Sequence, residues 1–146
     1  MLRFIKLFSI IAVLFLSHAA MAGKNTLTAG SVWINQSGST ITFTSVDPTN
    51  GQLSGFYINN AKGYSCQGTP YQVTGYTYGT LISWSVNWRN AYQDCQSMTG
   101  WTGFYDPSSG TFKTSWNLVF NNKISDGNDV FKPVSLLKTQ GLISAR

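Results

Sequence analysis

The stretch from residue 81 to residue 88 constrains the fold most, because its side chains alternate between two faces. Apolar side chains occupy every second position, at Ile82, Trp84, Val86 and Trp88. This period of two is typical of a β-strand with one apolar face. A second run, residues 97–105, places Ser97, Thr99 and Trp101 on one face, so that hydroxyls and an indole share a surface. Together the two runs predict a pocket built around Trp88 and Trp101.

Alternating segments recur along the chain, at residues 31–35, 40–46, 52–59, 71–78, 81–88, 97–105, 111–120 and 129–134. Turn-forming sequences separate them, at residues 47–51, 79–80, 106–110 and 121–123. Eight strands in sequential hairpins predict an all-β fold, an eight-stranded antiparallel up-and-down β-barrel, because closure removes the exposed edges of a flat meander. The interior of such a barrel holds one small ligand. A two-sheet sandwich fits the same periodicity almost as well.

The first 22 residues have the plan of a secretory signal peptide. Arg3 and Lys6 precede an apolar run at residues 7–16, which is too short for a membrane span, and small residues stand before Gly23. We therefore expect a mature chain that begins at Gly23 and is secreted to the periplasm or the extracellular space.

The remaining chain is expected to form a single domain at residues 23–134, followed by a tail at residues 135–146 that lacks a strand pattern. No segment after the leader is apolar for long enough to cross a bilayer, so no membrane partner is expected. Loss of the leader lowers the net charge from +5 to +3, and the basic residues do not cluster, so the sequence gives no case for nucleic acid.

The composition argues against catalysis. The only histidine, His18, lies in the leader, and the chain contains no glutamate. General acid–base and nucleophilic catalysis therefore lose their commonest agents. We expect a protein that is not an enzyme and holds no metal.

Cys66 and Cys95 are the only cysteines of the chain. An even count in an exported protein is typical of a disulfide, which would stabilise the fold by about 3 kcal/mol by restricting the unfolded chain. The two cysteines lie in the longer connections, residues 60–69 and 89–96, which an up-and-down barrel places at the same end. The bridge would therefore stiffen the rim of an opening.

Several polar side chains fall on strand positions where a small barrel has little room for water. They are Asn35, Ser39, Tyr57, Asn59 and Asp129. Burial of unpaired polar groups costs about 1–3 kcal/mol each, and a ligand is one way to pair them. Alternatively, they face solvent, cap turns or bond to one another. The chain also has five tryptophans. Most large aromatic residues in a small barrel belong to the core, but rings beside hydrogen-bonding groups also suit a neutral heterocycle or a sugar.

Six short strings resemble the avidin and streptavidin family in order and spacing over nearly all of the mature chain. They are residues 33–39, 51–57, 73–75, 84–90, 99–103 and 115–118. Streptavidin is a familiar case of an eight-stranded barrel that holds one small ligand. The resemblance implies a protein that binds biotin with high affinity at the open end of the barrel and needs no cofactor.

The resemblance also implies a role for each site residue. Asn35, Ser39 and Tyr57 would donate hydrogen bonds to the ureido oxygen of biotin, and Asn59 and Asp129 would accept hydrogen bonds from its N–H groups. The bicyclic ring would lie among Trp88, Trp101, Trp116 and Leu118, with Thr99 near the thioether sulfur. Ser97 and the loop at residues 60–62, which contains Ala61, would lie near the valeryl carboxylate.

Two departures from the tetrameric members suggest a different assembly. The segment between Trp116 and Asp129 is short and contains no tryptophan, whereas tetrameric members use one there to cover the site of a neighbouring subunit. The two rim cysteines are instead similar to those of the short dimeric avidins of bacteria, the rhizavidin type. The resemblance thus implies a homodimer with one biotin per subunit.

Two other functions fit parts of the sequence. A secreted carbohydrate-binding or cell-surface-binding module would use the same aromatic residues in a shallow, exposed row, whereas the avidin resemblance implies enclosed rings. An exported hydrolase is the weaker alternative, because histidine and glutamate are missing from the mature chain.

Overall fold

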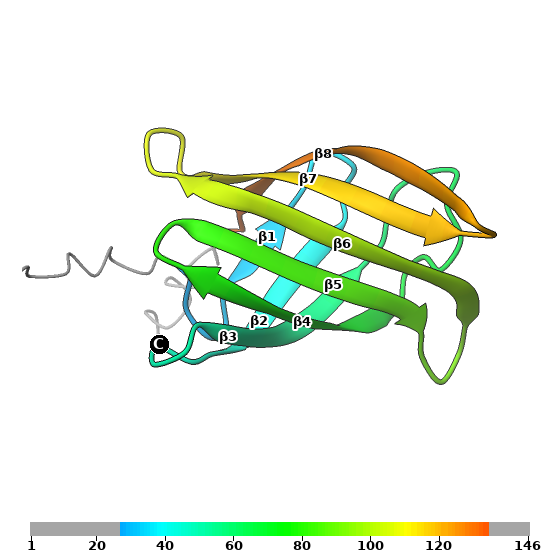
Figure 1. Ribbon diagram of the computed structural model, residues 1–146, viewed down its shortest axis with the longest axis horizontal. Helices are drawn as coiled ribbons and strands as arrows, with labels where there is room; N and C mark the ends of the chain where they lie inside the picture. The colour runs from blue at the N-terminus through cyan, green and yellow to red at the C-terminus, as the bar shows by residue number, and fades with distance from the viewer. Residues whose placement is uncertain (1–26, 135–146) are drawn as a thin grey trace, which may run out of the picture.

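The alternating segments fold into strands, and the strands close into a β-barrel (Figure 1). The computed structural model describes residues 27–134. Its strands are β1 (Val32–Ile34), β2 (Thr40–Val46), β3 (Gln52–Ile58), β4 (Pro70–Tyr78), β5 (Leu81–Arg89), β6 (Asp94–Asp106), β7 (Thr111–Phe120) and β8 (Lys123–Pro133). The expected signal peptide, residues 1–22, and the expected tail, residues 135–146, lie outside the described residues.

Each strand pairs antiparallel with the next, and β8 pairs antiparallel with β1. This arrangement confirms the eight-stranded antiparallel up-and-down barrel and excludes the two-sheet sandwich. No helix in the described part of the chain is long and apolar enough to cross a membrane.

The apolar face of β5 points inward as predicted. Ile82, Trp84, Val86 and Trp88 are all buried, whereas Leu81 and Asn87 are exposed. Other strands of the barrel add buried apolar side chains that complete the core, among them Ile41, Phe43, Leu53, Tyr71, Val73 and Phe131. The period-two pattern therefore decides which side chains face the interior.

All strand bounds lie within one residue of those expected, except the starts of β6 and β8. β1 is shorter, because Asn35 already begins the turn to β2 through a backbone hydrogen bond from its N–H to the carbonyl of Ser39 (2.9 Å). β6 begins at Asp94 and β8 at Lys123, several residues earlier than expected. The first residues of β8 are exposed and pair with β7 as a hairpin arm, so they carry no apolar alternation that a sequence pattern could detect.

The two ends of the barrel differ. Trp33 packs against Phe112 with ring centroids 4.4 Å apart and against Tyr105 at 6.3 Å, so aromatic rings fill one end. The connections at the other end are residues 35–39, 59–69, 90–93 and 121–122. Asn121 and Asn122 both have positive φ, at 49° and 58°, which is the conformation of a tight two-residue hairpin turn.

Candidate binding site

The barrel contains a cavity of about 880 Å³ at the end opposite to the rings of Trp33, Tyr105 and Phe112. Its lining includes all of the site residues expected from the sequence: Asn35, Ser39, Tyr57, Asn59, Ala61, Trp88, Ser97, Thr99, Trp101, Trp116, Leu118 and Asp129. The cavity lies in the size range of small-molecule sites. The fold thus brings together residues from five strands, β3 and β5–β8, and from the connections between strands.

Asn35 joins the first turn to the centre of the cavity. Its Oδ1 accepts hydrogen bonds from the backbone N–H groups of Ser37 (3.0 Å) and Ser39 (2.9 Å). Its Nδ2 donates to Oδ1 of Asp129 (3.1 Å) and to the hydroxyl of Tyr57 (3.4 Å). The alternative expectation, that Asn35 caps a turn, is therefore correct, and the same side chain also reaches the cavity.

Ser39 and Asn59 connect the first turn to the β3–β4 connection. The hydroxyl of Ser39 accepts a hydrogen bond from the N–H of Asn60 (2.9 Å) and donates to Oδ1 of Asn59 (3.4 Å). Asn59 also accepts from the N–H of Ala61 (3.0 Å) and donates to the carbonyl of Ser65 (3.0 Å). Both side chains are buried, and their positions are fixed before any ligand arrives.

Asp129 is 6% exposed and places its carboxylate inside the barrel. It lies well within β8, whereas the sequence pattern placed it at the beginning of that strand. Its Oδ2 accepts a hydrogen bond from Nε1 of Trp101 (2.9 Å), and its Oδ1 accepts from Asn35 and from Nε2 of Gln36 (2.8 Å). Three donors offset the desolvation of a buried carboxylate.

Tyr57 keeps its proton. Burial raises the pKa of its hydroxyl well above the ordinary value, and the negative charge of Asp129 raises it further. Hydrogen bonds with Ser39 and Asn35 oppose this shift but do not cancel it. The hydroxyl therefore remains a hydrogen-bond donor at neutral and mildly alkaline pH.

Aromatic rings form the walls of the cavity. Trp88 and Trp101 lie with ring centroids 6.4 Å apart, and the ring of Tyr57 lies 5.0 Å from that of Trp101. The indole N–H of Trp88 donates to Oγ1 of Thr99 (2.7 Å). Trp84 lies behind this group and stacks on Trp101 at 5.7 Å. The indole orientations are therefore fixed by hydrogen bonds and by stacking.

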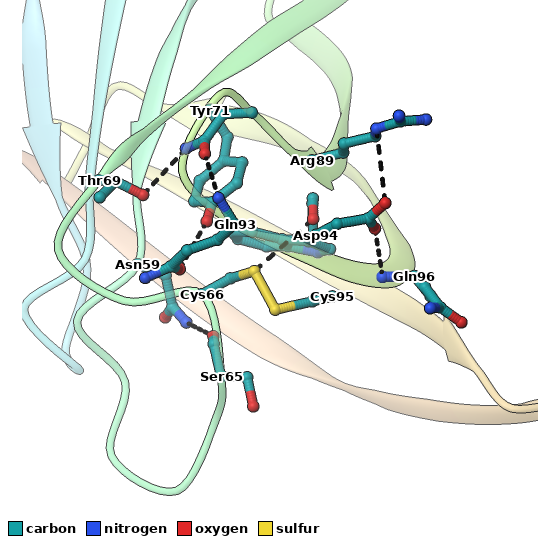
Figure 2. The surroundings of a disulfide bond; sticks show 12 residues. Asn59, Ser65, Cys66, Thr69, Tyr71, Arg89, Gln93, Asp94, Cys95 and Gln96 are labelled. Carbon is teal, nitrogen blue, oxygen red and sulfur yellow. Dashed lines mark hydrogen bonds and ion pairs between the residues drawn. A yellow bond between two sulfur atoms is a disulfide. The ribbon is translucent and has the colours of Figure 1, made fainter.

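The expected disulfide is confirmed. Cys66 and Cys95 are bonded, with their Cα atoms 6.3 Å apart, and both line the cavity (Figure 2). The bridge joins the β3–β4 connection to the start of β6, so the two segments lie at the same end of the barrel as expected.

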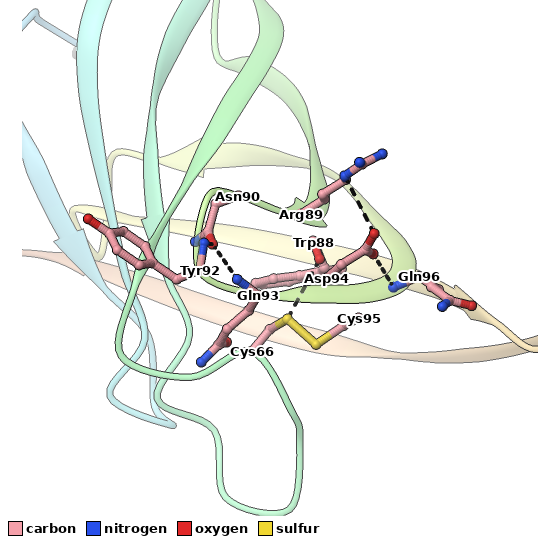
Figure 3. A network of polar contacts seen from close by, with 9 residues as sticks. All are labelled: Cys66, Trp88, Arg89, Asn90, Tyr92, Gln93, Asp94, Cys95 and Gln96. Atoms are coloured by element: carbon pink, nitrogen blue, oxygen red, sulfur yellow. Dashed lines mark hydrogen bonds and ion pairs between the residues drawn. A yellow bond between two sulfur atoms is a disulfide. The ribbon is translucent and has the colours of Figure 1, made fainter.

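Polar contacts support the bridge. The hydroxyl of Tyr71 donates to Oε1 of Gln93 (2.9 Å), and Nδ2 of Asn90 donates to Oγ1 of Thr69 (3.0 Å). Asn90 also accepts from the backbone N–H of Gln93 (2.8 Å), which shapes the β5–β6 connection (Figure 3). One covalent bond and several hydrogen bonds therefore hold one side of the rim.

The structure adds residues that the sequence did not single out. Gln36 binds Asp129 from the first turn, and Phe120, Lys123 and Ser125 extend the cavity along the β7–β8 arm. Lys123 and Ser125 have no signal in the sequence because the start of β8 lacks an alternating pattern, and Gln36 lies in a turn, where strand periodicity gives no signal. Residues 27–134 contain no group of three side chains suited to hold a metal ion.

A closed antiparallel barrel with an aromatic, hydrogen-bonding cavity at one end defines the class of small-molecule-binding β-barrel proteins. Comparison with known proteins narrows this class. Residues 23–133 match the model of the Avidin family. The chain belongs to the avidin family.

Individual relatives agree with this assignment. Afifavidin from Afifella pfennigii is 43% identical over 111 residues, which cover 72% of this chain and 69% of that protein. Hoefavidin from Hoeflea phototrophica is 43% identical over 126 residues, which cover 78% of this chain and 77% of that protein. The crystal structure of a rhizavidin–biotin complex has a TM-score of 0.72 and 41% identity, covering 79% of this chain and 99% of that chain. The resemblance found in the sequence is therefore confirmed.

Gly127 provides room for Trp116, a wall of the cavity, and this gives a test of the packing. The two residues are directly opposite in the β7–β8 pairing, and a Cβ at Gly127 would lie 2.5 Å from Cζ2 of Trp116. Gly127→Ala is expected to displace the indole and to lower the free energy of unfolding by about 1–3 kcal/mol. Urea denaturation and near-ultraviolet circular dichroism measure both effects. Asp126→Ala, at the exposed neighbouring position of β8, is the control; equal effects of the two substitutions would contradict this role of Gly127.

Proposed function

We propose that this protein binds biotin in the barrel cavity, one molecule per subunit, and performs no chemistry on it. Avidin-family membership and the polar groups of the cavity carry this conclusion. Rhizavidin, to which the chain is similar, has been solved in complex with biotin. The head group of biotin is a cyclic urea, with one carbonyl oxygen between two N–H groups, so its site must offer donors and acceptors side by side.

Donors for the ureido oxygen come from Asn35, Ser39 and Tyr57. In the structure the Asn35–Tyr57 and Ser39–Asn59 hydrogen bonds are both 3.4 Å long, which is long for such bonds. These two contacts are therefore weak, so the hydroxyl of Ser39 and one hydrogen of the Asn35 amide are available to a ligand oxygen, whereas Asp129 holds the other hydrogen of that amide. Because they are positioned in advance, they stabilise negative charge on that oxygen with little reorganisation.

Acceptors for the ureido N–H groups are Asp129 and Asn59. Asp129 is the stronger, because a hydrogen bond to a charged group contributes more than one between neutral groups. Trp88, Trp101, Trp116 and Leu118 would enclose the bicyclic ring, and Thr99 would approach its sulfur. Ser97 and Ala61, nearer the rim, would meet the valeryl chain and its carboxylate.

The disulfide supports the affinity of this site. A rim segment that is ordered before binding loses less conformational entropy when the ligand arrives. Cys66 and Cys95 hold that segment within one chain, so no second subunit is required to order it.

The carbohydrate-binding alternative requires a shallow, exposed row of tryptophans. Trp88 is 6% exposed and Trp101 is 4% exposed. Enclosed rings favour a ligand that enters the barrel, so this alternative has no support.

Titration with biotin tests the proposed function. In oxidised protein, the tryptophan fluorescence is expected to change and to saturate near one equivalent per chain. Asp129→Ala is expected to weaken binding by about 2–3 kcal/mol, or roughly 30- to 150-fold in Kd, because a ureido N–H loses a charged acceptor. Asp126→Ala on the exposed part of β8 is the matched control. Absence of binding by the folded wild type, or unchanged affinity of Asp129→Ala, would refute the assignment.

We also propose that the protein is a homodimer that associates through the outer wall of the barrel. Exposed apolar side chains gather on β4–β8, among them Tyr76, Leu81, Met98, Phe104, Val119 and Ile124. They lie around a hollow of about 590 Å³, which is lined in part by the small residues Ser83, Ser85, Gly100 and Thr102. Exposed apolar side chains that gather on one face are typical of a protein interface.

Light scattering coupled to size-exclusion chromatography tests the dimer. Val119 lies between Met98 and Ile124 in the strand register. Val119→Lys is expected to give monomers, because it buries an unpaired charge at the interface. Phe56→Lys, on the exposed face of β3 and 47% exposed in the wild type, is expected to leave the dimer intact. A monomeric wild type at micromolar concentration would overturn the proposal.

We further propose, mainly from the sequence, that the protein is exported from the cytoplasm. Its support is the leader pattern of residues 1–22, the start of the family match at residue 23 and the presence of a disulfide. Expression of the full chain in a bacterial host is expected to yield a periplasmic or secreted product whose N-terminal residue is Gly23. An uncleaved product in the cytoplasm would contradict export.

A further inference from the structure

The seam between the first and the last strand is the shortest pairing of the barrel. β1 and β8 are paired at two positions, Trp33 with Pro133 and Ile34 with Lys132. Pro133 has no N–H group to contribute to the ladder. If β1 continued in this register, Gln36 would stand opposite Val130.

The main chain does not continue, because it turns toward β2. The N–H of Asn35 donates to the carbonyl of Ser39 (2.9 Å), and the N–H of Gly38 donates to the carbonyl of Asn35 (3.1 Å). The backbone of β8 next to this turn therefore lacks a neighbouring strand on that side.

The side chain of Gln36 takes the place of the missing strand. Its Oε1 accepts a hydrogen bond from the N–H of Val130 (3.0 Å), and its Nε2 donates to the carbonyl of Asn128 (3.0 Å). A primary amide offers the same donor and acceptor as a peptide group, so it continues the ladder for one further step. The pairing also determines the orientation of the amide, since the backbone N–H requires an oxygen.

The same amide reaches the cavity. Its Nε2 also donates to Oδ1 of Asp129 at 2.8 Å. An NH₂ group has two hydrogens, so one serves the carbonyl of Asn128 and the other serves the carboxylate. The Gln36 amide therefore bonds to the backbone on both sides of Asp129, at Asn128 and Val130, and also to the side chain of Asp129.

We propose that Gln36 is a positioning residue, which closes the β1–β8 seam and fixes the Asp129 carboxylate for the ligand. The part of this inference that concerns the ligand rests on the proposed function, whereas the seam does not. Asparagine is one methylene shorter, and glutamate has no N–H to donate at neutral pH. Among these side chains glutamine alone provides the acceptor and both donors at this reach.

Two substitutions separate the two roles. Gln36→Met keeps the length of the side chain but removes all three hydrogen bonds. Gln36→Glu keeps an acceptor for the N–H of Val130 but places a second negative charge beside Asp129. Gln72→Met on the exposed face of β4 is the matched control.

Hydrogen exchange in the ligand-free protein measures how well the backbone N–H groups at the β1–β8 seam are protected. Exchange at the N–H of Val130 is expected to accelerate at least about tenfold in Gln36→Met and much less in Gln36→Glu. The N–H of Val134, which bonds to the carbonyl of Val32 (2.8 Å), is expected to stay protected in both variants. Unchanged exchange at Val130 in Gln36→Met would refute closure of the seam by this side chain.

The position of the carboxylate is measured by the NMR signal of the Trp101 indole N–H, which bonds to Asp129. This signal is expected to shift in both Gln36 variants and to remain in place in Gln72→Met. Biotin is then expected to dissociate about tenfold faster from Gln36→Met and faster still from Gln36→Glu. An unshifted indole signal, or wild-type dissociation from Gln36→Glu, would refute positioning. Failure of the wild type to bind biotin would refute the proposed function. The hydrogen-exchange measurements on the ligand-free protein would still show whether Gln36 closes the β1–β8 seam.

Discussion

The buried carboxylate of Asp129 is the constraint on which the cavity depends. A buried negative charge is tolerable only with several donors around it, and these come from β6 and from the β1–β2 turn. The carboxylate in turn fixes the orientations of the Trp101 indole and the Asn35 amide, which donate to it. Asn35 then contacts Tyr57, so the charge organises both the polar and the aromatic parts of the cavity. The network also explains why polar groups occupy the interior of a barrel that apolar side chains alone could fill.

Much of this molecule could be predicted from the sequence, because its inward-facing side chains repeat every two residues. The alternation along β5 and β6 places Trp88, Thr99 and Trp101 correctly without any knowledge of relatives. The period of two could not choose between a barrel and a sandwich, since both satisfy it; closure becomes visible only in the pairing of β8 with β1. The arm at residues 123–128 was missed because both of its faces are exposed, which removes the signal.

Individual side-chain contacts lie beyond such patterns. Gln36 stood within a string that resembles the family, yet nothing in its spacing indicates that its amide pairs with β8. The role of Gly127 is also hidden from the sequence, because it depends on the ring of Trp116 opposite to it. The pairing of these two residues could be predicted only from the correct start of β8. A sequence pattern specifies faces, whereas these two residues act through neighbours on another strand.

The contacts of Asp129 with Asn35 and Gln36 join residues that are 94 and 93 positions apart. Contacts of such long sequence separation form late, because the intervening chain must first be ordered. The polar centre of the cavity is therefore completed only when the last strand docks beside the first. A chain whose β8 has not yet docked contains the tryptophans of β5–β7 but lacks the carboxylate of Asp129, which lies on β8. Ligand capture thus begins only with the finished barrel.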